Sequence, residues 1–312
     1  MFKNLCISAA TLLLSSSLYA TTPSPEPEPE PDEPCYFNCD PGNDNNPYLR
    51  GPNPTVSALE NTRSGPYSVR TQSVSGWSAS GFGGGTIHYP TNAGGNMGAI
   101  AVVPGYVSYE SSIRWWGSRL ASWGFVVITI DTNTIYDQPD SRARQLSAAL
   151  DHVISESNNS RSAIAGMVDS SRLAAIGWSM GGGGSLKLST DRNLKAIIPQ
   201  APWYSGFNSF NRISTPTLII ACELDVVAPV ASHAADFYSD IPNSTSKAFL
   251  EIDNGDHFCA NSGGSDEDIL GKYGIAWMKR FVDNDRRFDQ FLCGPNHASD
   301  RSISTYRDTC NY

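Results

Sequence analysis

Residues 175–185 read Ala-Ile-Gly-Trp-Ser-Met-Gly-Gly-Gly-Gly-Ser and directly follow an apolar run. Four consecutive glycines are costly in any regular element, so a tight turn or a close backbone contact must require them. The stretch is not a phosphate-binding P-loop, because Gly184 is followed by Ser-Leu-Lys rather than by Lys and then Ser or Thr. It is not a dinucleotide fingerprint either, since no choice of first glycine places glycines at positions one, three and six.

Gly177-Trp-Ser-Met-Gly181 fits the pattern Gly-x-Ser-x-Gly, in which a sharp turn between a strand and a helix presents a serine. The residues before it are typical of a buried strand, and residues 180–189 are typical of a helix. Small residues on both sides of the serine avoid clashes in this turn, and Gly182 to Gly184 would let the helix lie close against the sheet. An inert glycine-rich turn is the alternative, but the context predicts Ser179 as a nucleophile.

Short apolar runs alternate with helical patterns from about residue 55 onward. Residues 67–74 and 85–89 show the alternation of paired strands. Continuous apolar runs, as in strands buried on both faces, occupy residues 99–103, 125–130, 173–176, 196–198 and 218–221. A last strand is expected at residues 249–252, and helices at residues 113–122, 140–155, 180–189, 229–239 and 266–284. The fold class is therefore α/β, with a mostly parallel central sheet and helices on both faces. Residues 201–215 form only a loop, so no large lid is expected.

A serine hydroxyl needs a base within hydrogen-bond reach, and in this architecture the chain order is serine, acid, histidine. His257 lies in a turn directly after the expected strand 249–252, where a loop can reach the serine, and is predicted as the base. Among the other histidines, His233 is assigned to a helix and His297 to the polar C-terminal tail. His88 is assigned to a strand surface and His152 to a helix face.

The acid that orients the base is expected at the end of a strand. Asp225 follows the run 218–221 and is predicted for this role. Glu223 is the alternative, but alternating side-chain direction favours the aspartate. Asp253 and Asp256 flank His257 too closely to orient it and are assigned to the turn.

The tetrahedral intermediate of acyl transfer needs two hydrogen-bond donors for its oxyanion. The backbone N–H of Met180, directly after the nucleophile, supplies one by geometry. The loop after the strand 99–103 is expected to supply the other, and we assign it to the N–H of Tyr106, with an ordinary loop aromatic as the alternative.

The N-terminal segments differ from the rest of the chain in composition. Residues 1–20 have a basic start at Lys3, an apolar stretch and a small residue, Ala20, at a cleavage point, as in an export signal. Residues 21–54 carry seven acidic side chains and one basic one and alternate Pro with Glu at their start, which predicts a disordered tail. The catalytic domain is expected to span residues 55–312, and the protein to be secreted, with the periplasm as the alternative.

Composition excludes several partners. The formal net charge is -9, and no block of Lys and Arg is present, which argues against nucleic acid. Beyond the signal no segment approaches eighteen apolar residues, so no membrane span is expected. The serine chemistry requires no metal and no organic cofactor, although a weak surface calcium site stays open, and we expect a monomer.

Six cysteines remain after the signal, an even number that suggests disulfides in an exported protein. Six thiols allow fifteen pairings, so the sequence leaves the connectivity open. A Cys222–Cys259 bridge would clamp the acid loop to the base loop, and Cys293 and Cys310 would then staple the C-terminal tail. Cys35 and Cys39 would form a small local bridge.

Five stretches together resemble the bacterial cutinase-like polyester hydrolases, the group that includes the poly(ethylene terephthalate) hydrolases. They are Gly-Trp-Ser-Met-Gly-Gly-Gly-Gly from residue 177, Val-Pro-Gly-Tyr from 103, Phe-Val-Val-Ile-Thr-Ile-Asp-Thr-Asn-Thr from 125, Pro-Gln-Ala-Pro-Trp from 199, and His-Phe-Cys-Ala-Asn-Ser-Gly from 257. The resemblance covers about residues 55–312. It implies an α/β-hydrolase fold, ester hydrolysis through an acyl-enzyme, and a shallow open groove.

The resemblance also assigns roles. Ser179, Asp225 and His257 match the family's triad, and Tyr106 and Met180 match its oxyanion hole. Trp203 matches a tryptophan that contacts an aromatic acyl group, and Cys222–Cys259 matches the active-site disulfide of one branch. The sequence departs from that branch at Phe258, a bulky substrate-contacting position, and at His233 and Phe237 beside Trp203. Their bulk should restrict the tryptophan and narrow the groove, which favours aliphatic over stiff aromatic polyesters.

The sequence therefore favours a secreted serine esterase that hydrolyses polyesters. The enzymatic alternative is a carboxylesterase or lipase for small soluble acyl esters. A non-catalytic surface-binding module with an aromatic patch of Tyr106, Trp178, Trp203 and Phe258 is the alternative from another class, and Trp178 itself is expected in the core.

Overall fold

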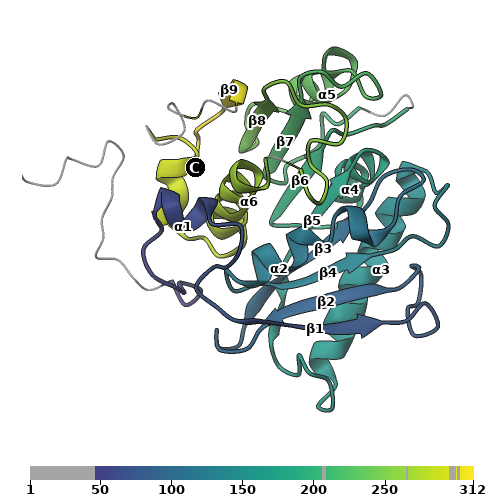
Figure 1. Cartoon of the computed structure of the whole chain (residues 1–312), viewed down its shortest axis with the longest axis vertical. Helices are drawn as coiled ribbons and strands as arrows, with labels where there is room; N and C mark the ends of the chain where they lie inside the picture. Colours follow the sequence, from purple (N-terminus) through teal and green to yellow (C-terminus); the bar gives the residue numbers. More distant parts are fainter. Residues whose placement is uncertain (1–45, 206–208, 265, 295–299, 301–302) are drawn as a thin grey trace, which may run out of the picture. The chain divides into compact units, whose positions relative to one another are not determined.

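The computed structural model describes residues 46–205, 209–264, 266–294, 300 and 303–312 (Figure 1). The expected export signal, residues 21–45 of the expected tail, and the Cys35 and Cys39 pair lie outside these residues.

Within the described residues the sheet has nine strands in the order β1-β2-β4-β3-β5-β6-β7-β8-β9 (Figure 1). Their bounds are β1 Val69–Val74, β2 Gly85–Pro90, β3 Met97–Val103, β4 Val126–Ile130, β5 Val168–Trp178, β6 Ala196–Gln200, β7 Thr217–Cys222, β8 Lys247–Ile252 and β9 Ile303–Asp308. The strands from β3 to β8 pair in parallel, while β1 with β2, β2 with β4, and β8 with β9 pair antiparallel. The carboxyl ends of the parallel strands therefore share one edge of the sheet, which we call the carboxyl edge.

Helices cover both faces of the sheet. Their bounds are α1 Val56–Glu60, α2 Trp115–Ala121, α3 Pro139–Asn158, α4 Met180–Asp191, α5 Ala234–Asp240 and α6 Glu267–Val282, with short 3-10 turns η1 Glu110–Ser112, η2 Val230–Ser232 and η3 Arg286–Phe291. One core cluster joins α1, α2 and α6 to one face of the strands, and a second joins α3, α4 and α5 to the other. Each strand side chain points to the opposite face from its neighbour, so the continuous apolar runs supply both cores.

The structure confirms the predicted α/β class and each predicted strand. Strand β9 was not predicted, because its sequence Ile-Ser-Thr-Tyr-Arg-Asp is polar and its residues are half-buried or exposed at the sheet edge. The helix expected at residues 229–239 is divided into η2 and α5 at His233, whose backbone leaves the helical region at φ −132° and ψ −90°. None of the helices in the described part of the chain combines the length and apolarity needed to cross a bilayer.

The folded body begins earlier than residue 55. The Asn46 amide donates to the carbonyl of Asp283 at 2.9 Å, and the Arg172 guanidinium lies 3.7 Å from the centre of the Tyr48 ring. Arg50 donates to the carbonyl of Asn96 at 3.1 Å. Residues 46–54 were assigned to the tail because such contacts use polar side chains, which leave no apolar pattern in the sequence.

Candidate active site

Ser179 occupies a strained turn between β5 and α4. Its backbone lies at φ 56° and ψ −120°, a conformation that costs a non-glycine residue about 1–3 kcal/mol. The flanking glycines make the turn sterically feasible. A Cβ on Gly177 would lie 1.9 Å from the Gly181 carbonyl oxygen, and a Cβ on Gly181 would lie 2.6 Å from the Pro104 carbonyl oxygen. No larger residue fits at either position, so both glycines are required by backbone packing.

The three glycines that follow allow close contacts of α4 with the end of β6, with the loop after it and with α3. A Cβ on Gly182 would lie 2.9 Å from Pro202 Cα, and a Cβ on Gly183 would lie 2.2 Å from the Trp203 carbonyl oxygen. A Cβ on Gly184 would meet Arg142 of α3 at 3.0 Å. The expected close approach to the sheet holds at Gly182, whose Cβ would also lie 3.0 Å from the carbonyl oxygen of Gln200, the last residue of β6. Gly183 and Gly184 instead bring α4 against the loop after β6 and against α3.

The structure brings Ser179, His257 and Asp225 into one hydrogen-bonded chain at the carboxyl edge. His257 Nε2 lies 2.9 Å from Ser179 Oγ, and His257 Nδ1 lies 2.7 Å from Asp225 Oδ2. The three residues are only 5–6% exposed. Asp225 Oδ1 accepts two further bonds, both 2.8 Å long, from the backbone N–H groups of Val227 and Ala228. Both oxygens of the carboxylate are thus fixed.

These contacts keep Asp225 ionised. Burial by itself raises the pKa of a carboxyl group, but the bonds from His257, Ala228 and Val227 outweigh it and lower the pKa of Asp225 below its ordinary value. A carboxylate that stays charged can orient the imidazole and stabilise its protonated form.

The loop after β3 lies directly against the serine. A Cβ on Gly105 would lie 2.9 Å from Ser179 Cβ and 2.8 Å from the Trp178 ring. Tyr106 follows Gly105 directly in this loop, so its backbone N–H stays the candidate for the second donor. Met180 begins α4, so its backbone N–H is among the first of the helix, which have no partner within it. These are the two candidate oxyanion donors.

The loop carrying His257 is held by the expected disulfide and by two indole hydrogen bonds that the sequence did not predict. The Trp178 indole N–H donates to the His257 carbonyl at 2.8 Å, and the Trp115 indole N–H donates to the Ala260 carbonyl at 3.1 Å. The Cys222–Cys259 disulfide joins the same loop to the loop of Asp225. Trp178 is buried, as expected, but its ring also lies 5.3 Å from the imidazole. Burial was readable from the sequence, whereas the direction of an indole N–H was not.

Aromatic rings border the site. Trp203 stacks with His233 at 6.3 Å between ring centres, and His233 meets Phe237 edge-on at 5.9 Å. Of the two bulky residues predicted beside Trp203, His233 thus contacts its ring directly, and Phe237 contacts the ring of His233. Phe258 is 56% exposed and packs on Trp178 at 5.5 Å.

The residues considered as alternatives lie elsewhere or make other bonds. His233 Nδ1 is within 3.1 Å of Ser232 Oγ, and Glu223 accepts a bond of 2.8 Å from the Asn254 N–H. His297 lies outside the described residues. The prediction that His88 lies on a strand surface is wrong. Its side chain is 3% exposed and is hydrogen-bonded to Thr129.

Among the described residues two disulfides are present, Cys222–Cys259 and Cys293–Cys310, with the pairing that the sequence suggested. Cys293, Cys310 and Asp308 have donor atoms within 4.8 Å of one another. The sulfurs of Cys293 and Cys310 are bonded to each other, so neither cysteine is a thiolate of the kind a metal site needs.

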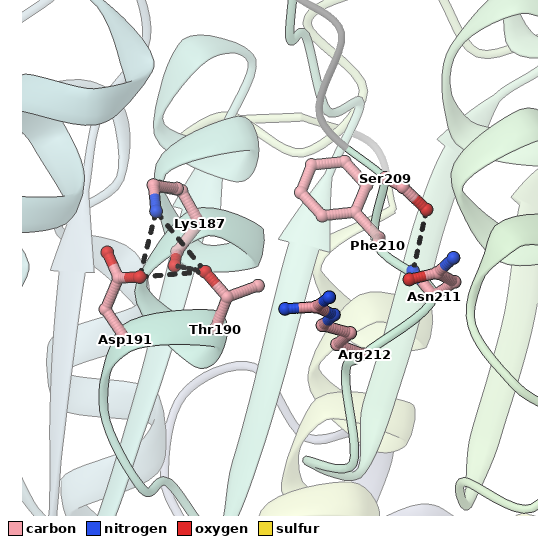
Figure 2. Close-up of a pocket in the computed structure, with 7 residues that line it drawn as sticks. All are labelled: Lys187, Thr190, Asp191, Ser209, Phe210, Asn211 and Arg212. Atoms are coloured by element: carbon pink, nitrogen blue, oxygen red, sulfur yellow. Dashed lines mark hydrogen bonds and ion pairs between the residues drawn. The ribbon is translucent and has the colours of Figure 1, made fainter.

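A separate hollow of about 470 Å³ lies at the far end of α4 (Figure 2). It is lined by Lys187, Thr190, Asp191 and residues 209–212 and includes none of the predicted site residues. Lys187 is already paired with Asp191 at 2.8 Å, so its charge is not free for a ligand.

The sheet order and the serine turn at the end of its fifth strand define an α/β-hydrolase. A sequence model of the family described as PET hydrolase-like matches residues 42–311. The chain belongs to the PET hydrolase-like family.

Characterised relatives agree with this family. The chain is 53% identical over 269 residues to Cutinase 2 of Thermobifida cellulosilytica, which covers 86% of this chain and 99% of the relative. It is 54% identical over 269 residues to a cutinase of Thermobifida fusca (strain YX), covering 86% of both chains. It is also 55% identical over 257 residues to Lipase 1 of Moraxella sp. (strain TA144), covering 81% of this chain and 77% of the relative.

Proposed function

We propose that the protein is a secreted serine esterase that hydrolyses polyesters through an acyl-enzyme. The observation that carries the mechanism is the chain of bonds from Ser179 Oγ to His257 Nε2, 2.9 Å, and from His257 Nδ1 to Asp225 Oδ2, 2.7 Å. The observation that carries the substrate class is the identity of 53–54% to the Thermobifida cutinases.

The reaction has two halves. Ser179 Oγ attacks the ester carbonyl carbon while His257 Nε2 takes the hydroxyl proton, and the carbonyl oxygen becomes an oxyanion that accepts bonds from the N–H groups of Met180 and Tyr106. The intermediate collapses, the C–O bond to the alcohol breaks, and the alcohol leaves with the proton from the imidazolium. Water then attacks the acyl-enzyme and gives a proton to His257 Nε2. The second intermediate collapses, the bond between the acyl carbon and Ser179 Oγ breaks, and the imidazolium returns its proton to Oγ as the acid leaves. Asp225 stays ionised throughout and stabilises the imidazolium.

The aromatic rings at the site are proposed to select the acyl group. Trp203 contacts the acyl part of the substrate, and its stacking on His233 limits its rotation. Phe258 adds exposed bulk beside the base. We therefore expect aliphatic polyesters to be hydrolysed faster than stiff aromatic ones.

A carboxylesterase or lipase for small soluble esters is the second candidate, supported by the likeness to Lipase 1 of Moraxella. Product analysis separates the two functions: the wild-type enzyme and Ser179→Ala are compared on polyester films and on short p-nitrophenyl esters. Hydrolysis of both substrates by the wild-type enzyme, lost in Ser179→Ala, is the expected result. Hydrolysis of the soluble ester with no release from any film would overturn the polyester function.

Export and a monomeric state are part of the same proposal. Residues 1–20 have the composition of an export signal, and two disulfides suit an oxidising compartment. N-terminal sequencing of the protein from culture medium and from periplasm, with light scattering of the purified enzyme, tests both.

A further inference from the structure

Large hydrophobic side chains that face solvent gather on one side of the molecule. In the described part of the chain nine such side chains are exposed, and all nine lie in loops at the carboxyl edge, where Ser179 also lies. We call this set the apolar rim: Trp77, Tyr106, Val107, Tyr109, Tyr136, Leu224, Val226, Val227 and Phe258. Single exposed hydrophobic residues are ordinary on protein surfaces, but their collection on one edge indicates a contact surface.

Trp77 is the most exposed member and lies outside the reacting site. It is 99% exposed, in the hairpin between β1 and β2. The hairpin turn is ordered around it, because the N–H groups of Ser78 and Ala79 both donate to the Ser75 carbonyl at 3.0 Å. Phe82 of the same hairpin is buried and packs on His152 of α3 at 5.6 Å. One aromatic ring thus anchors the hairpin while the other is presented to solvent.

The hairpin is joined to the candidate site through the loop after β4. The Gly83 N–H donates to the Asp131 carbonyl at 2.9 Å. Further along the same loop, the Tyr136 ring meets the Tyr106 ring at 5.8 Å. The hairpin that carries Trp77 is therefore fastened to the loop of Tyr136, and that loop contacts the loop beside Ser179.

The charges in these loops limit what the surface can bind. The loops of residues 75–84, 104–114, 131–138, 223–229 and 253–264 contain seven carboxylates, of which Glu110 and Asp225 are buried, with one arginine and no lysine. An anionic lipid surface or an acidic polymer would be repelled by this charge. A neutral apolar solid would be attracted to the rings without such a penalty.

We propose that the apolar rim is an adsorption surface for solid polyester, with Trp77 as an anchor that holds the enzyme on the polymer without touching the reacting ester. This inference rests on the proposed polyester hydrolysis. A ring that is removed from water on adsorption contributes to the adsorption free energy through the apolar area it buries. Even a partly buried tryptophan is expected to change the adsorption constant about ten-fold.

The test compares Trp77→Ser with the conservative Trp77→Tyr. In a Ser179→Ala background, which separates adsorption from turnover, binding to a polyester film is measured by depletion from solution. We expect Trp77→Ser to weaken adsorption about ten-fold and Trp77→Tyr to restore most of it. With Ser179 intact, kcat and KM on a short soluble ester should be unchanged in both variants, while release from film at low enzyme concentration should fall in Trp77→Ser.

Several results would overturn the inference. Unchanged adsorption of Trp77→Ser would remove Trp77 as an anchor. Equal binding to vesicles of anionic lipid would show that the surface is not selective for a neutral solid, and a dimer that Trp77→Ser dissociates in light scattering would assign the surface to a second copy. A failure of the proposed function looks different, since the wild-type enzyme would then adsorb to the film and release no product.

Discussion

Acidification should destabilise this protein well above the pH at which its carboxylates titrate, because of one buried histidine. His88 of β2 is 3% exposed, and its Nε2 lies 3.2 Å from Thr129 Oγ1. Its Nδ1 has no hydrogen-bond partner among the described residues, and a Cβ on Gly117 of α2 would lie 2.3 Å from its ring. Burial lowers the pKa of His88 from 6.5 to about 4, although nearby Glu110 opposes the shift.

The size and direction of the effect follow from this shift. At pH 7 the imidazole is neutral in the folded chain and mostly neutral in the unfolded chain, so the protonation penalty on the folded state is small. Between about pH 6.5 and pH 4 the unfolded chain binds a proton that the folded chain does not, and stability falls. A lowering of about 2.5 pKa units corresponds to about 3 kcal/mol, which is fully lost once the pH is below 4.

Chemical denaturation at intervals from pH 7 to pH 4 measures this loss, with His88→Gln as the matched variant that cannot titrate. The variant should be less stable at pH 7, because its side chain fills the site poorly. The difference between the two proteins should then shrink by about 3 kcal/mol as the pH falls to 4, while effects of other groups cancel. Parallel stability curves for the two proteins would refute the reasoning.

Two further predictions concern the loop of His257. Trp178→Phe leaves the His257 carbonyl without its buried donor, a loss of about 1–3 kcal/mol, so kcat on a soluble ester should fall about 5- to 150-fold with KM nearly unchanged. The control is Trp123→Phe, the same change at a buried indole whose N–H has no partner in the described residues. It should lower stability and leave kcat unchanged. Equal kcat in the two variants would contradict a role for the hydrogen bond from Trp178 to His257. Replacing Cys222 and Cys259 together with serine removes a link across a sequence separation of 37 residues, which should cost about 4 kcal/mol and lower Tm by roughly 8–15 °C in calorimetry. A Tm within about 2 °C of the wild type would show that the loop is held without the disulfide.

The sequence predicted those parts of the fold whose cause is local. Continuous apolar runs mark strands buried on both faces, so β3 to β8 could be recognised within a few residues. The serine turn was recognisable because its glycines are demanded by backbone contacts at Gly177 and Gly181. Strand β9 could not be found, because an edge strand is held by its pairing with β8, a contact distant in the chain.

The site was predictable to the extent that chain order constrains it. Strand ends placed Ser179, Asp225 and His257 at one edge, and the cysteine positions suggested the bridge between the acid loop and the base loop. No local pattern indicates the indole hydrogen bonds that also hold the base loop. The bond from Trp178 to that loop depends on the rotamer of a buried ring. The burial of His88 depends on the close approach of Gly117 from α2, which only the assembled fold brings about.

The contact between α4 and the loop after β6 has a consequence for how selectivity could evolve. The Trp203 N–H and the Gly183 N–H both donate to the Ser179 carbonyl, at 2.9 and 3.0 Å, and Gly183 has no room for a side chain beneath Trp203. The backbone of Trp203 is thus hydrogen-bonded to that of Ser179, and the fold fixes the distance between the two residues. Changes in His233 or Phe258 could therefore reshape the walls around an acyl chain while the line of attack on its carbonyl stays where it is.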